Sequence, residues 1–121
     1  MLKTISDYRL LKSLESLKKN DASQSRQYLD KVLGVRDEDY DFIVAFDAMV
    51  MGFESRHDEA LRRFKEARTL LEKYSDTDSQ YIKLFCRYYE CILVEGGNCD
   101  KIKDQALSLK AGKSVRMFLK M

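Results

Sequence analysis

The chain contains no proline and no tryptophan, and only five of its 121 residues are glycine. Proline and glycine are the residues that interrupt helices most strongly, so their scarcity leaves long stretches free to be helical. The abundant residues are Leu, Lys, Glu, Asp, Arg and Ala, which favour helix over strand. We therefore predict an all-α protein.

Long hydrophobic runs are also absent. No window reaches the roughly 18 uncharged apolar residues that a membrane-spanning helix needs. Residues 1–19 lack the continuous apolar core of a signal peptide. We predict no membrane span and a cytoplasmic location, that is, a reducing interior. The length suits one domain, so we expect residues 1–121 to form a single all-helical domain.

Signatures of metal binding and catalysis are missing as well. Cys86, Cys91 and Cys99 are odd in number and contain no CxxC pair, and His57 is the only histidine. Disulfide frameworks and zinc sites need pairs or spacings that this set does not provide, so we expect three free cysteines in helix interfaces. No Gly-rich phosphate loop is present. We expect a protein that is not an enzyme and that has neither metal nor cofactor.

The most apolar stretch, 41–53, indicates a central helix that is covered on more than one side. The next stretch, 57–74, carries one apolar stripe at the helical period, made of Ala60, Phe64, Ala67 and Leu71. Between them, Ser55 to Asp58 fits the Ser-x-x-Asp pattern of a helix N-cap. Two helices joined by so short a turn are expected to pack antiparallel.

This hairpin resembles a tetratricopeptide repeat (TPR). Ala60, Phe64 and Ala67 fall on the second-helix positions of the family pattern, and Ala48 falls on its small first-helix position. The resemblance covers about a quarter of the chain. Four pattern positions differ, namely those occupied by Val44, Asp47, Met51 and Glu72.

Helical patterns on either side extend the hairpin into three units. We predict antiparallel hairpins at about 4–34, 38–74 and 77–111, stacked as a short TPR-like solenoid, with a C-terminal cap at 113–121 that packs over the third unit. Second helices would start near Asp21, His57 and Cys99, which are 36 and 42 residues apart. Helical-hairpin solenoids have periods of about 34 to 47 residues. The alternative is a closed six-helix bundle.

The TPR arrangement implies a binding surface, because one stripe of each first helix lines the concave side of the stack. The candidate partner-binding residues are Phe42, Phe46, Met49, Phe53, Tyr81, Phe85 and Tyr88. Aromatic and methionine side chains suit such grooves because they bury a large area and adapt their shape. The same residues could instead pack one unit against the next.

Asp47 interrupts the most apolar stretch. A buried carboxylate must be paired, hydrogen-bonded or protonated. We expect a structural bond to an arginine or tyrosine of a neighbouring helix, and we expect Asp47→Leu to be tolerated.

Charge is distributed unevenly. Residues 37–80 contain six basic and twelve acidic residues, whereas 1–36 and 81–121 each contain eight basic and four acidic ones. This pattern could steer a partner, align copies of the chain, or reflect solvated helix faces. The function we expect is protein binding, as an adaptor or chaperone for a peptide or helix of another protein. The alternatives are a homo-oligomeric structural protein and, less favoured, a nucleic-acid accessory factor with a basic end at residues 101–121.

Overall fold

The computed structural model describes residues 8–33, 40–95 and 98–120. Within these residues all regular structure is helical, which confirms the all-α class. The helices are α1 (Tyr8–Lys18), α2 (Ala22–Leu33), α3 (Tyr40–Phe53), α4 (His57–Leu71), α5 (Thr77–Glu95), α6 (Asp100–Leu107) and α7 (Lys113–Phe118). None of the helices in these ranges combines the length and the apolar character needed to cross a membrane.

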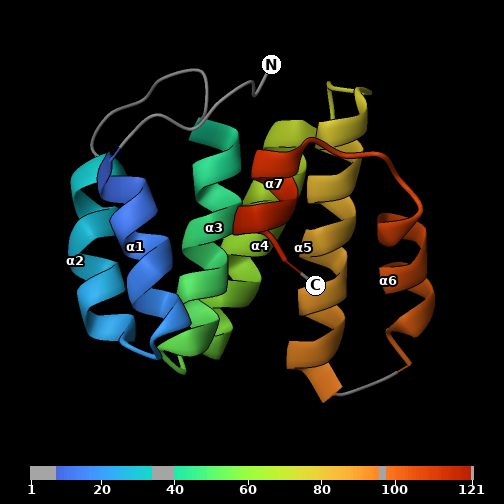
Figure 1. The fold of residues 1–121 in the computed structure, drawn as a ribbon. Coiled ribbons are helices and arrows are strands. Elements are labelled where there is room, and N and C mark those ends of the chain that lie inside the picture. Colours follow the sequence, from blue (N-terminus) through green and yellow to red (C-terminus); the bar gives the residue numbers. More distant parts are fainter. Residues whose placement is uncertain (1–7, 34–39, 96–97, 121) are drawn as a thin grey trace.

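Consecutive helices pack against each other, most extensively α3 with α4 and α1 with α2. The next largest contacts join α4 with α5 and α5 with α6. In Figure 1 α2 and α6 lie at opposite ends of the molecule, α1, α3, α4 and α5 lie between them, and α7 lies in front of the middle. Helices α2, α4 and α6 begin at Ala22, His57 and Asp100, each close to the predicted start.

Acidic caps fix two of the helix starts. The Gln24 N–H donates to Asp21 Oδ1 at 3.0 Å, and the Ser79 N–H donates to Asp76 Oδ2 at 3.1 Å. Both bonds satisfy backbone donors that the first turn leaves free. The predicted Ser55 cap is wrong: Arg56 is the N-cap of α4 and makes no side-chain cap bond. Ser55 has a φ of 62°, so it serves the turn rather than the helix.

Helix α3 is the centre of the core. Every residue from Phe42 to Val50 is buried, as the all-round apolar pattern predicts. On α4 the buried residues are Ala60, Phe64, Ala67 and Leu71, which confirms the predicted stripe. The small residues Ala48 and Ala60 are both fully buried, as close approach between the two helices requires.

The predicted pairing of Asp47 is confirmed. Its side chain is 1% exposed and accepts two charge-assisted hydrogen bonds, one from Arg26 of α2 (Nη1 to Oδ1, 2.5 Å) and one from Arg63 of α4 (Nε to Oδ2, 2.8 Å). Arg26 also donates through Nη2 to Glu54 Oε1 at 2.8 Å. Burial lowers the pKa of Arg26, but the bonds to Glu54 and Asp47 outweigh that effect and raise its pKa above the ordinary value. Three helices are therefore tied together by one carboxylate.

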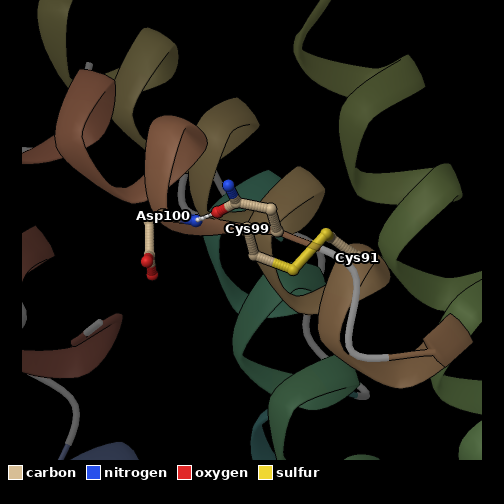
Figure 2. Close-up of a disulfide and its surroundings, with 4 residues drawn as sticks. Cys91, Cys99 and Asp100 are labelled. Carbon is tan, nitrogen blue, oxygen red and sulfur yellow. Dashed lines mark hydrogen bonds between the residues drawn. A yellow bond between two sulfur atoms is a disulfide. The ribbon is translucent and has the colours of Figure 1, made fainter.

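The expectation of three free cysteines is wrong. Cys91, near the end of α5, and Cys99, just before α6, form a disulfide with Cα atoms 6.0 Å apart (Figure 2). The packing of α6 against α5 brings the two cysteines within bridging distance, which a count of cysteines does not reveal. Cys86 remains a free, buried thiol, and burial raises its pKa above the ordinary value.

The C-terminal helix also differs from its predicted place. We expected residues 113–121 to pack over the third hairpin. Figure 1 shows α7 in front of α4, between α3 and α5. Its aromatic residue, Phe118, packs against Phe42 and Phe46 of α3. The helix therefore covers the groove between the second and third pairs.

Candidate functional site

The candidate site is the groove between α3 and α5, and α7 fills one half of it. Phe118 meets Phe42 and Phe46 edge-on, with ring centroids 5.7 and 5.5 Å apart. Val115, Phe118 and Leu119 are each no more than 1% exposed. Val115 and Phe118 are three residues apart and share one face of the short helix, and Leu119 follows them as its C-cap. The filled half is thus sealed by a small apolar cluster.

Two tyrosines of α5 hold the chain that follows α7. The Tyr81 hydroxyl donates to the Leu119 carbonyl at 2.7 Å, and the Tyr89 hydroxyl donates to the Lys120 carbonyl at 3.3 Å. Burial raises the pKa of both tyrosines, so both remain protonated donors over the physiological pH range. These bonds satisfy backbone carbonyls that a helix end leaves without partners.

The other half of the groove is open and apolar. One cavity of about 180 Å³ is lined by Met49, Gly52, Phe53, Phe64, Tyr89, Ile92 and Leu93. A second cavity of about 160 Å³ is lined by Leu14, Leu17, Lys18, Met49, Phe53, Tyr89, Met117, Phe118 and Lys120. Met49, Phe53 and Tyr89 line both cavities, so the two are contiguous. Helices α1, α3, α5 and α7 all contribute to their walls.

Exposed apolar side chains gather at this opening. Phe53, Ile92 and Met117 are 54%, 42% and 40% exposed, and each lines at least one of the two cavities. A helix end that presents large apolar groups to water at a concave surface is typical of an interaction site. Each cavity is smaller than the roughly 300 Å³ expected for a small-molecule pocket, so each suits one or two inserted side chains.

The structure separates the predicted binding residues into four that are buried, two that line the open cavities, and Tyr88. Phe42, Phe46, Tyr81 and Phe85 are at most 2% exposed, so they are packed inside the protein, and partner binding by them stays a prediction. The first three are covered by α7, and Phe85 packs against Phe64 and Tyr89. Met49 and Phe53 line the open cavities as expected. Tyr88 lies edge-on to Tyr89 and is not among the residues that line either cavity.

Tyr89 is the residue that the sequence analysis missed. It lines both cavities and also contacts Phe64 and Phe85. The signal was present, because Phe85, Tyr89 and Ile92 are spaced by four and three residues. Residues three and four positions apart both share a helix face, and our prediction took Tyr88, three residues after Phe85, in place of Tyr89. The contribution of α1 through Leu14 and Leu17 could not be read from the pattern of α3 and α5.

A larger depression of about 290 Å³ lies between α4 and α5, and its lining is polar. Two of its basic residues have partners: Arg68 Nε pairs with Glu90 Oε2 at 2.7 Å, and Lys83 Nζ donates to the Tyr74 carbonyl at 3.0 Å. This depression therefore has fewer groups available to contact a ligand than the apolar groove has. In the described part of the chain, no three His, Cys, Asp or Glu side chains gather as metal ligands would.

The basic residues of the C-terminal end lie on separate elements. Lys101 and Lys103 belong to α6, whereas Lys113 and Arg116 belong to α7. Lys110 lies between these two helices, and Lys120 follows α7. Nucleic-acid binding by this end stays a prediction.

Comparison with known protein families, curated proteins and solved structures finds no match for this chain.

Proposed function

We propose that this protein is a non-enzymatic, TPR-like interaction module whose groove between α3 and α5 binds a segment of a partner protein. The observation that carries the proposal is the open half of the groove, where two contiguous apolar cavities meet beneath three exposed apolar side chains. The partner would insert one or two apolar side chains there, presented by a helix or a peptide. An adaptor or chaperone would use such a surface.

The order of the helices supports the TPR-like description. Neighbouring pairs contact each other in sequence, α2 with α3 and α4 with α5, as stacked hairpins do. The first helices of the pairs, α1, α3 and α5, line the second cavity, which is the inner-helix role in a TPR stack. A closed six-helix bundle would instead bring α1 against α6, whereas Figure 1 shows these two helices on opposite sides of α3 and α5.

Gly52 provides a direct test, because it lines the first cavity and a Cβ added there would meet nothing within 4 Å. Replacing Gly52 by leucine would fill the cavity, and it would also favour the helix by about 0.5–1 kcal/mol because glycine is a poor helix former. We expect Gly52→Leu to bind its partner at least tenfold more weakly while its melting temperature is unchanged or higher. Loss of binding could then not be attributed to unfolding.

A matched pair of surface substitutions gives a second test. Phe53 and Leu107 are 54% and 55% exposed, but only Phe53 lines the groove, whereas Leu107 lies on α6 outside both cavities. The tagged protein would be purified gently from its own cells, and partners would be identified by mass spectrometry. We expect a near-stoichiometric protein that is lost with Phe53→Glu and retained with Leu107→Glu.

Other outcomes would contradict the proposal. A partner that survives both Gly52→Leu and Phe53→Glu binds somewhere else on the surface. Recovery of the protein alone, at the mass of a dimer that Phe53→Glu dissociates, would assign the groove to self-association. Either result can be distinguished by size-exclusion chromatography with light scattering on the same samples.

A further inference from the structure

Helix α7 occupies the same groove that the proposed partner would enter. Met117 and Phe118 form part of the wall of the second open cavity, so the filled and open halves share side chains. A partner segment that extends along the groove from the open half would meet α7. It must therefore end there or displace it.

In its length and in its dependence on neighbouring residues, α7 resembles a bound peptide more than a core helix of the fold. The helix has only six residues, and a helix this short has little stability of its own. Residues 108–112, which lead to it from α6, are not helical. Its shape therefore depends on the groove, as that of a bound peptide does.

We propose that α7 is an internal ligand of the groove, and that the partner segment is an amphipathic helix of the same chemistry that displaces it. The chemistry is a face like that of Val115, Phe118 and Leu119, with an aromatic anchor and a basic outer side supplied in α7 by Lys113 and Arg116. This inference rests on the proposed function, since it names the segment that the groove would recognise.

The groove recognises α7 through contacts that another helix could reproduce. One is the edge-on contact of a single aromatic ring with both Phe42 and Phe46. The others are the hydroxyls of Tyr81 and Tyr89, which bind backbone carbonyls and so make no demand on the side chains that follow the anchor. An incoming helix needs one aromatic residue near its C-terminal end to use all of them.

A hydrogen bond to Asp78, in the first turn of α5, holds the N-terminal end of α7. The Gly112 N–H, just before α7, donates to Asp78 Oδ1 at 2.7 Å. Asp78 lies in the first turn of α5 and lines neither open cavity. Removing this carboxylate should raise the population in which α7 is undocked without altering the groove itself.

The test uses the full chain and, as a probe, a fluorescein-labelled peptide of residues 113–120, which lacks Gly112 and so does not itself depend on Asp78. Loss of one hydrogen bond to a carboxylate corresponds to about a tenfold change in equilibrium constant, and affinity for the probe rises with the undocked fraction. By fluorescence anisotropy we expect Asp78→Ala to bind the probe about tenfold more tightly than the unmodified chain. Asp58→Ala, which removes a first-turn acid from α4, is the matched control and should leave binding unchanged.

A peptide carrying Phe118→Asp should lose at least 100-fold in affinity, because the aromatic anchor supplies most of the buried contact. Hydrogen exchange read by mass spectrometry should show the α7 amides of Asp78→Ala exchanging at least tenfold faster than in the unmodified chain, while those of α3 change little. If the probe fails to bind Asp78→Ala although these amides exchange quickly, or if α7 exchanges as slowly as α3 in both proteins, α7 is a permanent cap and the inference is wrong.

Gly52→Leu separates this inference from the proposed function. Gly52→Leu fills only the open half of the groove. The double variant Gly52→Leu, Asp78→Ala should therefore still bind the probe, in the half that α7 occupies. Partner recovery should increase with Asp78→Ala alone and be lost with Gly52→Leu. Partner recovery that depends on Gly52 but not on Asp78 would retain the proposed function and reject displacement of α7.

Discussion

Helices α4 and α6 each pack against the helix that precedes them, but they are held by different means. Helix α4 buries Ala60, Phe64, Ala67 and Leu71 completely, and its Arg63 and Arg68 reach carboxylates on α3 and α5. Helix α6 has eight residues, buries only Ala106, and packs mainly against α5. The Cys91–Cys99 disulfide ties its start to that helix.

The difference shows how position in a row of helices decides the source of stability. A helix with neighbours on both sides gains hydrophobic burial along its whole stripe, whereas a terminal helix has one neighbour and little to bury. A covalent link compensates at the terminal position by restricting the unfolded chain. The four predictions below test this contrast, beginning with the largest expected effect.

Removing a core side chain from α4 should have the largest effect. Phe64 is fully buried, and Phe64→Ala should lower the free energy of unfolding by about 4 kcal/mol because it leaves a cavity. Ile102 of α6 is only partly buried, so Ile102→Ala should cost about 1 kcal/mol. Urea unfolding followed by circular dichroism would measure both values. Equal losses would show that α6 is packed as well as α4.

Removing the disulfide should act locally on α6. The bridge spans eight residues, and loop-closure entropy assigns such a link about 2.5 kcal/mol. In the double variant Cys91→Ser, Cys99→Ser, the amides of α6 should lose hydrogen-exchange protection while those of α3 and α4 retain it.

Thiol titration provides the accompanying check. The folded protein should offer no reactive thiol, because Cys86 is buried and its pKa is raised, and reduction should expose two. Two reactive thiols in the folded protein without reduction would mean that no disulfide forms, as expected from the sequence for a reducing compartment.

Asp47→Leu tests the ionic link that α6 lacks. From the sequence we expected this change to be tolerated, but the two arginines revise that expectation. Without the carboxylate, Arg26 and Arg63 would face each other across an apolar site, although each keeps another carboxylate partner. We now expect a loss of about 2 kcal/mol, below the usual range for breaking a buried pair because both guanidinium groups are partly exposed. An unchanged melting temperature would restore the original expectation.

The smallest effect concerns the cap of α5, the helix against which both α4 and α6 pack. Neither α4 nor α6 has a side-chain N-cap bond, whereas Asp76 accepts two hydrogen bonds from Ser79. Asp76→Ala should cost about 1 kcal/mol at neutral pH.

Burial raises the pKa of Asp76, but its bonds to Ser79 outweigh this and lower the pKa below the ordinary 3.8. A lowered pKa in the folded state means that the stabilisation is complete above 3.8 and disappears as the pH falls through the folded value. The difference between the variant and the unmodified protein should therefore vanish in acid. A difference that persists there would assign the effect to something other than the ionised cap.

Periodicity alone determined much of the fold. The all-round apolar stretch of α3 and the single stripe of α4 predicted which residues are buried, because burial is what the hydrophobic period encodes. The same reasoning required a partner for Asp47, since an unpaired buried carboxylate is too costly, and it named arginine among the choices. These inferences depend on one element and its immediate neighbours.

Only the tertiary structure decided the features that join distant segments. Phe42 and Phe46 were recognised as a concave-side stripe, but that α7 covers them depends on a contact across about seventy residues of chain. Tyr89 and Leu14 meet at one cavity because α1, α3, α5 and α7 converge there. The Cys91–Cys99 bond likewise depends on the packing of α6 against α5. The spacing of apolar residues shows which face of a helix is buried, whereas the packing of the helices determines which residues cover that face.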